Sequence, residues 1–206
     1  MSTIHEILAL GPVMPVIVID DSRQAVPLAE ALLHGGLKTI EITLRTPAAL
    51  DSIRAVAAAC PDITIGAGTV INADLASAAR NAGAAFAVSP GTTPAVIEGC
   101  RMAGLPLLPG ASSVSEMMAL QEARFDAVKF FPANAAGGTG FIKSLISPLP
   151  GISVCPTGGI TAATAPDWLA LANVPCVGGS WVAPQADIAG GEFDAIAARA
   201  KTAAAL

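Results

Sequence analysis

Short apolar runs rich in β-branched residues recur along the chain, and each is followed by a segment with helical spacing. Apolar runs of about four to eight residues bounded by turn residues are typical of buried strands. We therefore predict eight strands, at PVIVI (15–19), TIEITL (39–44), ITIGAGT (63–69), AFAVSP (85–90), LPLLPG (105–110), AVKFFP (127–132), ISVCPTG (152–158) and PCVGGSW (175–181).

The segment AVPLAEALL (25–33) illustrates the helices expected between these strands. Its apolar residues at 25, 28, 29, 32 and 33 fall on one helical face, and Gly35-Gly36 follows as a C-terminal stop. Pro27 should lie in the first turn, where a proline is tolerated. Similar glycine stops occur in NAG (81–83) and MAG (102–104).

The alternation of eight strands with helices predicts an α/β fold, namely a (β/α)8 TIM barrel. A doubly wound open sheet is the alternative, but it would carry a glycine-rich loop after the first strand, where this chain reads IDDSRQ. Residues 1–10 are expected to form an extra N-terminal helix that closes the bottom of the barrel. Because we find no linker or change in composition, residues 1–206 are predicted to be a single domain.

The composition narrows the class of partners. Of the 206 residues 53% are hydrophobic and 13% charged, and the net charge is −5. The absence of any basic run argues against a nucleic-acid partner. Apolar stretches are too short to cross a membrane, and the N-terminus lacks the features of a secretory signal. We therefore expect a cytoplasmic protein without a membrane partner.

The metal-ligating residue types are scattered. His5 and His34 lie in helix-like segments without the spacing of metal ligands, so we predict no metal site. The four cysteines form no CxxC pair and are expected to be reduced packing thiols: Cys60, Cys100, Cys155 and Cys176.

Charged side chains occur inside the second predicted strand, TIEITLRT. Strand side chains alternate between two faces, so one set is apolar and suits the helix layer. The other set, which we expect to face the barrel interior, comprises Glu41, Thr43 and Arg45. A structural ion pair between Glu41 and Arg45 is the alternative to a catalytic role.

A lysine lies within the hydrophobic segment FDAVKFFPAN (125–134). Alternation places Lys129 and Phe131 on the face opposite Val128 and Phe130. An unpaired buried charge is costly, so a functional Lys129 is favoured. The alternatives are a charge that guards an edge strand, which a closed barrel lacks, or a side chain that reaches out to water.

Glycine pairs occur in PTGGI (156–160) and VGGSW (177–181), at the last two strands. Paired glycines allow backbone N–H groups to approach an anion, and the loops after these strands are the recurrent phosphate site of the fold. Thr157 and Ser180 could add hydroxyl donors, although most such pairs are only turns. With the amine, the carboxylate and the guanidinium, these loops suit Schiff-base chemistry on a phosphorylated keto acid.

The motifs GPVMPVIVI, EITLRT, IGAGTV, AVSPG, LPLLPGASSVSE, VKFFPA, CPTGGI and VGGSW follow one another along nearly the whole chain. In this order they resemble the 2-keto-3-deoxy-6-phosphogluconate (KDPG) aldolase family. This family of class I, lysine-dependent enzymes also includes 4-hydroxy-2-oxoglutarate (KHG) aldolases.

The resemblance implies roles for particular residues. Lys129 would be the Schiff-base lysine and Glu41 the general acid/base, while Arg45 and Thr69 would bind the pyruvyl carboxylate. Pro90 and Phe131 would line the pocket. The distal end of the substrate would meet Thr157, Gly158, Gly159, Gly179 and Ser180. The family needs no cofactor and is typically a homotrimer.

The implied reaction is cleavage of KDPG to pyruvate and glyceraldehyde 3-phosphate, so the partners are small molecules: a phosphorylated 2-keto acid, pyruvate and an aldehyde phosphate. Two alternatives remain open. One is an aldolase for KHG or for the galactonate-derived sugar acid that is epimeric at C4. Thr157, which by its position would lie close to this stereocentre, could influence which substrate is accepted. The other is a non-catalytic phosphometabolite-binding barrel in which Lys129 only balances an anion. The family pattern does not assign the glycine-rich segment 133–141, which we expect to be mobile.

Overall fold

The computed structural model describes residues 3–206, in which strands and helices alternate. The strands are β1 (Val13–Ile17), β2 (Thr39–Thr43), β3 (Thr64–Gly68), β4 (Phe86–Val88), β5 (Leu107–Leu108), β6 (Gly110–Ala111), β7 (Ala127–Phe130), β8 (Ser153–Pro156) and β9 (Val177–Gly179). The helices are α1 (Ile4–Leu8), the 3₁₀ turn η1 (Ser22–Gln24), α2 (Ala25–His34), α3 (Ala49–Ala59), α4 (Ala73–Asn81), α5 (Pro94–Met102), α6 (Val114–Glu122), α7 (Gly138–Leu145), α8 (Ala165–Leu169), α9 (Gln185–Gly190) and α10 (Phe193–Ala204).

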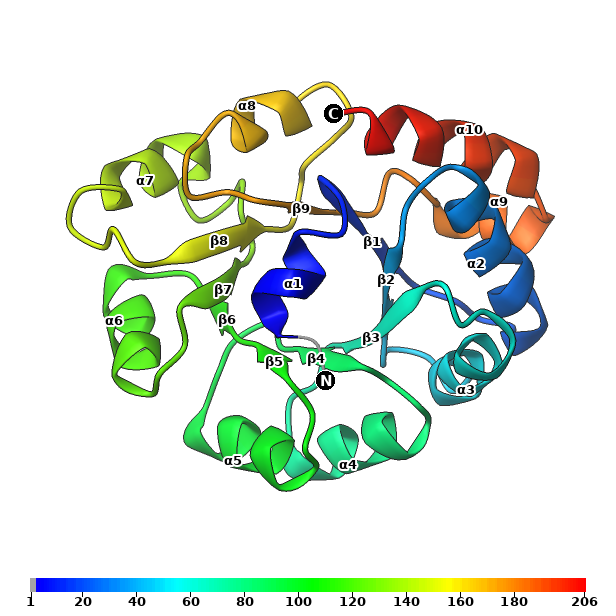
Figure 1. Cartoon of the computed structure of the whole chain (residues 1–206), viewed down its shortest axis with the longest axis horizontal. Helices are drawn as coiled ribbons and strands as arrows, with labels where there is room; N and C mark the ends of the chain where they lie inside the picture. Colours follow the sequence, from blue (N-terminus) through cyan, green and yellow to red (C-terminus); the bar gives the residue numbers. More distant parts are fainter. Residues whose placement is uncertain (1–2) are drawn as a thin grey trace.

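The strands form two parallel sheets. One has six strands in the order β5-β4-β3-β2-β1-β9, and the other has three in the order β6-β7-β8. A single parallel bridge joins Thr157, the residue after β8, to Gly178 in the middle of β9. The strands lie at the centre of the molecule, and α2 to α10 lie outside them (Figure 1). The prediction of an α/β fold built on parallel strands is confirmed.

The fifth predicted strand is divided in two. We predicted one strand at 105–110, whereas the structure has β5 paired with β4 and β6 paired with β7. Pro109 separates them, because proline has no N–H to continue a ladder. The first strand also ends earlier than predicted, at Ile17 rather than residue 19, since the apolar run continues into the loop.

Helix α2 follows the predicted pattern. Leu28 and Leu32 are fully buried on its apolar face, and Pro27 lies in its first turn, as expected. A β-carbon on Gly35 would lie 2.4 Å from that of Ala200, so glycine allows α2 and α10 to pack closely at this point. Gly36 has a φ of +92°, which glycine adopts without strain and which ends the helix.

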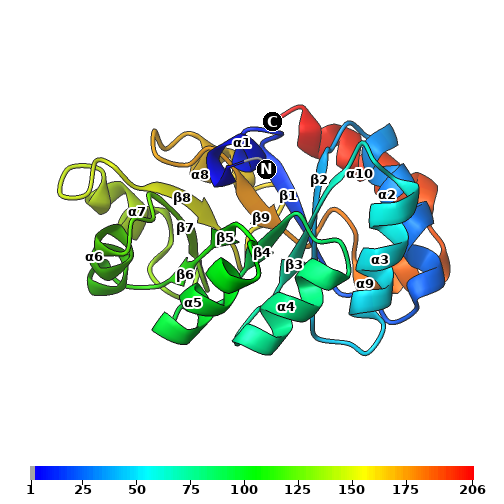
Figure 2. The same cartoon turned by 60° about the horizontal axis from the view of Figure 1, so that its bottom comes forward.

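The predicted N-terminal helix is confirmed for the part that lies within the described residues. Thr3 and Glu6 form a capping box at the start of α1. Ile7 and Leu8 are buried in a cluster with the strand residues Met14, Phe86, Val88, Leu108, Ala127, Cys155 and Cys176. Figures 1 and 2 show α1 lying across the centre of the strands. It therefore covers the end of the strands at which they begin.

The four cysteines are free and buried, as predicted. Burial raises the pKa of Cys100 to about 11, and that of Cys176 is raised well above its ordinary value by the Cys155 thiol and by burial. His5 lies at the surface as expected, with its Nε2 2.8 Å from Asp126 Oδ1. Within residues 3–206 no helix is long and apolar enough to cross a membrane, and His, Cys, Asp and Glu nowhere gather in threes to hold a metal ion.

Candidate active site

Lys129 lies in the middle of the three-stranded sheet, on β7 between β6 and β8. Its side chain is only 4% exposed, so the alternatives of an edge-strand charge and of a side chain reaching water are both wrong. Its Nζ donates to Glu41 Oε1 at 3.0 Å and to Oε2 at 3.3 Å. The buried charge is therefore paired rather than isolated, which offsets part of its desolvation cost.

Glu41 comes from β2 of the other sheet, and its side chain is 2% exposed. The alternative of an ion pair between Glu41 and Arg45 is wrong, because the carboxylate contacts Lys129 instead. Thr43, two residues further along β2, donates its hydroxyl to the Ile17 carbonyl at 2.8 Å. On the face of β2 predicted to point inwards, Glu41 is thus paired with Lys129 and the Thr43 hydroxyl has a hydrogen-bond acceptor.

A cavity of about 170 Å³ opens above the Lys129 amine. The Phe131 ring lies beside the amine, with its centroid 5.6 Å from Nζ. The lining consists of Val16, Val18, Arg45, Lys129, Phe131, Thr157, Gly158, Gly159, Ile160, Gly178 and Ser180. An unprotonated amine in this wall can act as a nucleophile on a bound carbonyl.

Arg45 and Thr69 are in direct contact at the edge of this site. Arg45 Nε donates to Thr69 Oγ1 at 3.1 Å. Thr69 has a φ of +62°, a left-handed conformation that is costly for a β-branched residue. Such strain persists only where the surroundings enforce it, and it is concentrated at functional sites. The geometry presents a hydroxyl and a guanidinium together, an arrangement suited to a carboxylate.

The first glycine pair forms the far wall of the cavity. Gly158 and Gly159 have φ values of +110° and +77°. The carbonyls of Thr157 and Gly158 accept bonds from the N–H groups of Ala133 and Asn134, at 2.8 and 3.1 Å. The Asn134 side chain donates to the Gly159 carbonyl at 2.7 Å. The glycine-rich segment 133–141 is thus attached to this wall and continues into α7; its mobility stays a prediction.

In the second glycine pair, Gly178 lines the cavity and Gly179 does not. A β-carbon on Gly178 would lie 2.2 Å from Thr157 Oγ1, whereas one on Gly179 would lie 2.0 Å from the Trp181 ring. Gly179 therefore makes room for an aromatic side chain. Ser180, the next residue, returns to the cavity wall.

Not all of the expected residues reach the cavity surface. Glu41, Thr69 and Pro90 are not among the lining residues. Glu41 contacts Lys129, Thr69 contacts Arg45, and Pro90 packs its backbone against Gly110. The lining residues that the sequence interpretation missed are Val16, Val18, Ile160 and Gly178. The sequence could have indicated the two valines, because they are two residues apart in the predicted first strand and their side chains therefore lie on the same face.

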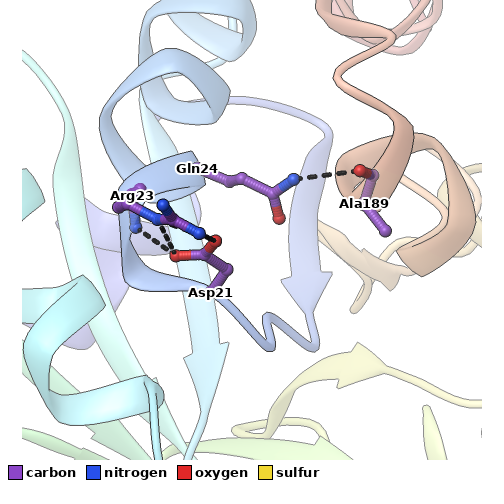
Figure 3. Close-up of polar contacts among 4 residues, drawn as sticks. All are labelled: Asp21, Arg23, Gln24 and Ala189. Atoms are coloured by element: carbon purple, nitrogen blue, oxygen red, sulfur yellow. Dashed lines mark hydrogen bonds and ion pairs between the residues drawn. The ribbon is translucent and has the colours of Figure 1, made fainter.

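The loop from β1 to α2 makes polar contacts through Asp21, Arg23 and Gln24 (Figure 3). Arg23 Nε donates to Asp21 Oδ1 at 3.0 Å and its Nη2 to Oδ2 at 2.6 Å. Hydrogen bonds from Arg23 lower the pKa of Asp21, and those to Asp21 raise the pKa of Arg23. Gln24 donates to the Ala189 carbonyl at 3.1 Å, which joins the loop to α9. Arg23 is thus paired within its own loop, whereas Arg45 lines the cavity.

The arrangement has two polar ends and a reactive centre. The paired amine and carboxylate lie at its base, the guanidinium on one side, and the glycine wall with the Ser180 hydroxyl on the other. A keto acid could place its carboxylate at the guanidinium and its ketone at the amine. An anionic group further along the molecule would then meet the glycine wall.

Comparisons with known proteins agree with this chemistry. The sequence model described as "KDPG and KHG aldolase" matches residues 4–199. The 2-dehydro-3-deoxy-phosphogluconate aldolase of Pseudoalteromonas atlantica is 47% identical over 201 residues, which cover 98% of this chain and 94% of that protein. The KHG/KDPG aldolase of Escherichia coli K12 is 43% identical, over 97% of this chain and 93% of its own.

A solved structure is also closely similar. It is that of the KDPG aldolase from Legionella pneumophila, with pyruvate captured at low pH as a covalent carbinolamine intermediate. Its TM-score is 0.96 at 40% sequence identity, and the match covers 98% of both chains.

Proposed function

The chain belongs to the KDPG and KHG aldolase family, and from this premise we propose that it is a class I aldolase for 2-dehydro-3-deoxy-6-phosphogluconate. The products are pyruvate and D-glyceraldehyde 3-phosphate. The observation that carries this assignment is the buried contact of 3.0 Å between Lys129 Nζ and Glu41 Oε1 at the base of a cavity bordered by Arg45.

Lys129 is the nucleophile. Its amine must lose a proton before it attacks the C2 ketone, and the adjacent Glu41 carboxylate is placed to accept that proton. Attack gives a carbinolamine. Glu41 returns the proton to the carbinolamine hydroxyl, which leaves as water and gives a protonated imine beside an ionised Glu41. The Phe131 ring, with its centroid 5.6 Å from the amine, covers one side of it and keeps water from that side.

Glu41 then acts as base and acid. It takes the proton of the C4 hydroxyl, directly or through a water, and the C3–C4 bond breaks as its electrons move into the imine. The aldehyde phosphate leaves, and an enamine of pyruvate remains on Lys129. Protonation of the enamine carbon and hydrolysis of the imine release pyruvate. Because the imine is the electron sink, the reaction needs neither a metal nor another cofactor.

The remaining site residues orient the substrate. Arg45, held at its Nε by Thr69, binds the carboxylate of the pyruvyl end. Phe131 borders the ketone, whereas Pro90 contributes indirectly, through the packing of its backbone against Gly110. Gly158, Gly159 and Ser180, together with Thr157, bind the phosphate at the distal end. Gly179 contributes indirectly, by accommodating Trp181 next to Ser180.

KHG aldolase activity is a second candidate. The family description names both substrates, and the relative from Escherichia coli K12 carries both names. KHG has the same keto acid end and lacks the phosphate, so it would use the Lys129 chemistry without the glycine wall. The two activities therefore differ in whether the glycine wall at the distal end of the cavity binds a phosphate of the substrate.

We also propose that the two sheets close into one (β/α)8 barrel that forms a single domain over residues 1–206. The bridge between Thr157 and Gly178 on one side, and the continuity through Pro109 on the other, support closure. A homotrimer is proposed as the assembly; the exposed apolar side chains Ile71, Met102, Val114 and Met118 fit a buried interface. The four buried thiols fit a reducing, cytoplasmic compartment.

Reductive trapping tests the function. Sodium borohydride with pyruvate should add the mass of one reduced pyruvyl group, and peptide mapping should place it on Lys129. Lys129→Arg should abolish both trapping and cleavage, because a guanidinium stays protonated. Labelling at Lys38, Lys143 or Lys201 instead would overturn the mechanism at Lys129, and no labelling at all would favour the non-catalytic binding barrel. Omission of pyruvate is the matched control.

A further inference from the structure

Two hydroxyl groups after β4 contact the main chain of Gly110, the first residue of β6. Ser89 is completely buried, and its Oγ accepts from the Gly110 N–H at 3.1 Å. Thr92 Oγ1 donates to the Gly110 carbonyl at 2.9 Å. The two hydroxyl oxygens lie 3.1 Å apart.

The direction of each bond follows from the number of protons. A hydroxyl has one proton, and that of Thr92 is used on the Gly110 carbonyl. The bond between the hydroxyls is therefore donated by Ser89. The four groups form a closed ring, in which the Gly110 N–H donates to Ser89, Ser89 to Thr92, and Thr92 back to the Gly110 carbonyl. Every donor has one acceptor.

This ring of hydrogen bonds takes the place of backbone pairing with β4, which Pro109 interrupts. Backbone pairing between β4 and β5 ends at Val88 and Leu108, and the Ser89 N–H still donates to the Leu108 carbonyl at 3.3 Å. Beyond Pro109 the two hydroxyls bind both main-chain groups of Gly110 in place of a neighbouring strand. A β-carbon on Gly110 would lie 2.4 Å from the carbonyl carbon of Pro90, so the strand is also held close to that loop.

Gly110 is the register partner of Lys129. The Lys129 N–H donates to the Pro109 carbonyl at 2.8 Å, and the Phe131 N–H donates to the Ala111 carbonyl at 3.2 Å. The residues on either side of Gly110 thus bind the main chain of β7 around Lys129. Gly110 itself points the other way, towards Ser89 and Thr92, because main-chain groups alternate in direction along a strand.

The ring also connects the two sheets. Glu41 belongs to the six-stranded sheet together with β4, and Lys129 belongs to the three-stranded sheet together with β6. Their contact at 3.0 Å therefore depends on how β6 is held against the end of β4. We propose that Ser89 and Thr92 are positioning residues that fix Lys129 relative to Glu41, an inference that rests on the proposed aldolase function.

The rate of imine formation tests this proposal. Enzyme mixed with pyruvate is quenched with borohydride at increasing times, and the labelled fraction is followed by mass spectrometry. Ser89→Ala and Thr92→Val should each slow labelling about tenfold, since small misplacements of a reacting group are costly. Thr92→Ser, which keeps the hydroxyl, should restore the wild-type rate. The KM for pyruvate should change little, because Arg45 and Thr69 are untouched.

The double variant Ser89→Ala/Thr92→Val should be no slower than the slower single variant, because the ring is broken only once. Thr93→Ala is the matched control. Thr93 is the next residue and caps α5 by accepting the Val96 N–H at 3.3 Å, so its loss should lower stability without slowing imine formation.

Wild-type rates in folded Ser89→Ala and Thr92→Val, with label on Lys129, would overturn the positioning role and leave the aldolase function intact. Equal slowing by Thr93→Ala would also overturn it, because the effect would then follow stability. Failure of the wild-type protein to label at Lys129 would instead overturn the proposed function.

Discussion

A β-carbon on Gly68 would lie 2.2 Å from Oε1 of Glu41 and 2.8 Å from its Cδ. The carboxylate therefore occupies the space that a side chain on β3 would fill. Lys129 contacts it from the opposite sheet. The position of the Glu41 carboxylate thus depends on the absence of a side chain at Gly68 and on the contact with the Lys129 ammonium group.

Gly68→Ala should displace the Glu41 carboxylate and lower kcat by about 10²-fold, the scale of a misplacement near 1 Å. The KM should change less than kcat, since the three atoms nearest to the added β-carbon all belong to Glu41 and none to Arg45. Gly66→Ala is the control, because its β-carbon would meet the Phe86 ring at 2.3 Å instead of Glu41. That variant should lose thermal stability more than turnover. A normal kcat in Gly68→Ala would contradict the claim that a side chain at this position displaces the Glu41 carboxylate.

Glu41→Gln keeps the shape of the side chain and removes its charge. We expect kcat to fall by about 10²- to 10⁴-fold, the range for loss of a positioned acid/base. The Lys129 ammonium also loses its charge partner, so the variant should unfold at a lower temperature. Steady-state kinetics and thermal melting measure the two effects separately. Near-normal turnover in a folded variant would make the pair purely structural.

Alternation along single strands predicted much of this site. It placed Glu41 and Lys129 on interior faces, and the structure buries both. Their contact was not predictable in the same way, because 88 residues separate them and their strands belong to different sheets. Alternation describes one strand at a time, whereas this contact depends on how the sheets meet.

The glycines show a second limit. Sequence patterns identify a pair such as Gly178-Gly179 but do not say which side chain each glycine accommodates. Here one faces Thr157 at the cavity and the other faces Trp181. The split of the fifth strand at Pro109 has a similar origin, since it depends on which neighbour each half pairs with. The apolar run itself looked continuous.

Thr69→Asn should separate stability from binding. Asparagine tolerates the left-handed backbone better than a β-branched residue does, so relief of the strain at φ +62° should raise the Tm by about 2–4 °C. The variant loses the hydroxyl that accepts from Arg45 Nε, so the KM for pyruvate in imine formation should rise about tenfold. Thr69→Ser keeps the hydroxyl and should keep the wild-type KM. A lower Tm for Thr69→Asn would refute the strain argument.

Glu116 should give acid-dependent stability. The N–H of Ser112, the hydroxyls of Ser112 and Ser113 and the N–H of Ser113 lower its pKa below the ordinary 4.5, against an opposing effect of burial. A lowered folded-state pKa means that the stabilisation is complete above about pH 4.5 and is lost as the pH falls through the folded value.

Glu116→Gln should therefore lower the Tm by about 1–3 °C at pH 7, the scale of one exposed capping interaction. The difference from wild type should be smaller at pH 3, because more of the Glu116 carboxylate is protonated there than at pH 7. Glu122→Gln at the other end of α6 is the control for loss of a carboxylate from the same helix. A Tm difference that is equal at both pH values would contradict the assignment.

Ser180 provides the test of the distal end. If the glycine wall and Ser180 bind a phosphate dianion, each charge-assisted hydrogen bond contributes about 1.5–3 kcal/mol. Three such bonds, discounted to about 4–6 kcal/mol, favour the phosphorylated six-carbon acid over KHG by on the order of 10³- to 10⁴-fold in kcat/KM. Competition between the two substrates on the wild-type protein measures this ratio. Equal efficiency would mean that the glycine pairs are only turns, and the function would then be that of the unphosphorylated aldolase.

Ser180→Ala removes one hydroxyl from the wall and leaves the backbone of Gly158 and Gly159 in place. It should lower kcat/KM for the phosphorylated acid about tenfold and leave that for KHG unchanged, because KHG has no group there. Ser180→Asp should reduce it further, since a carboxylate repels the dianion, and added salt should weaken that repulsion. Ser180 is preferable to Gly179 as a site of substitution. A side chain at 179 would displace Trp181, so an effect on packing could not be told apart from an effect on phosphate binding. Equal losses on both substrates in Ser180→Ala would place Ser180 near the reacting carbons and not at the phosphate.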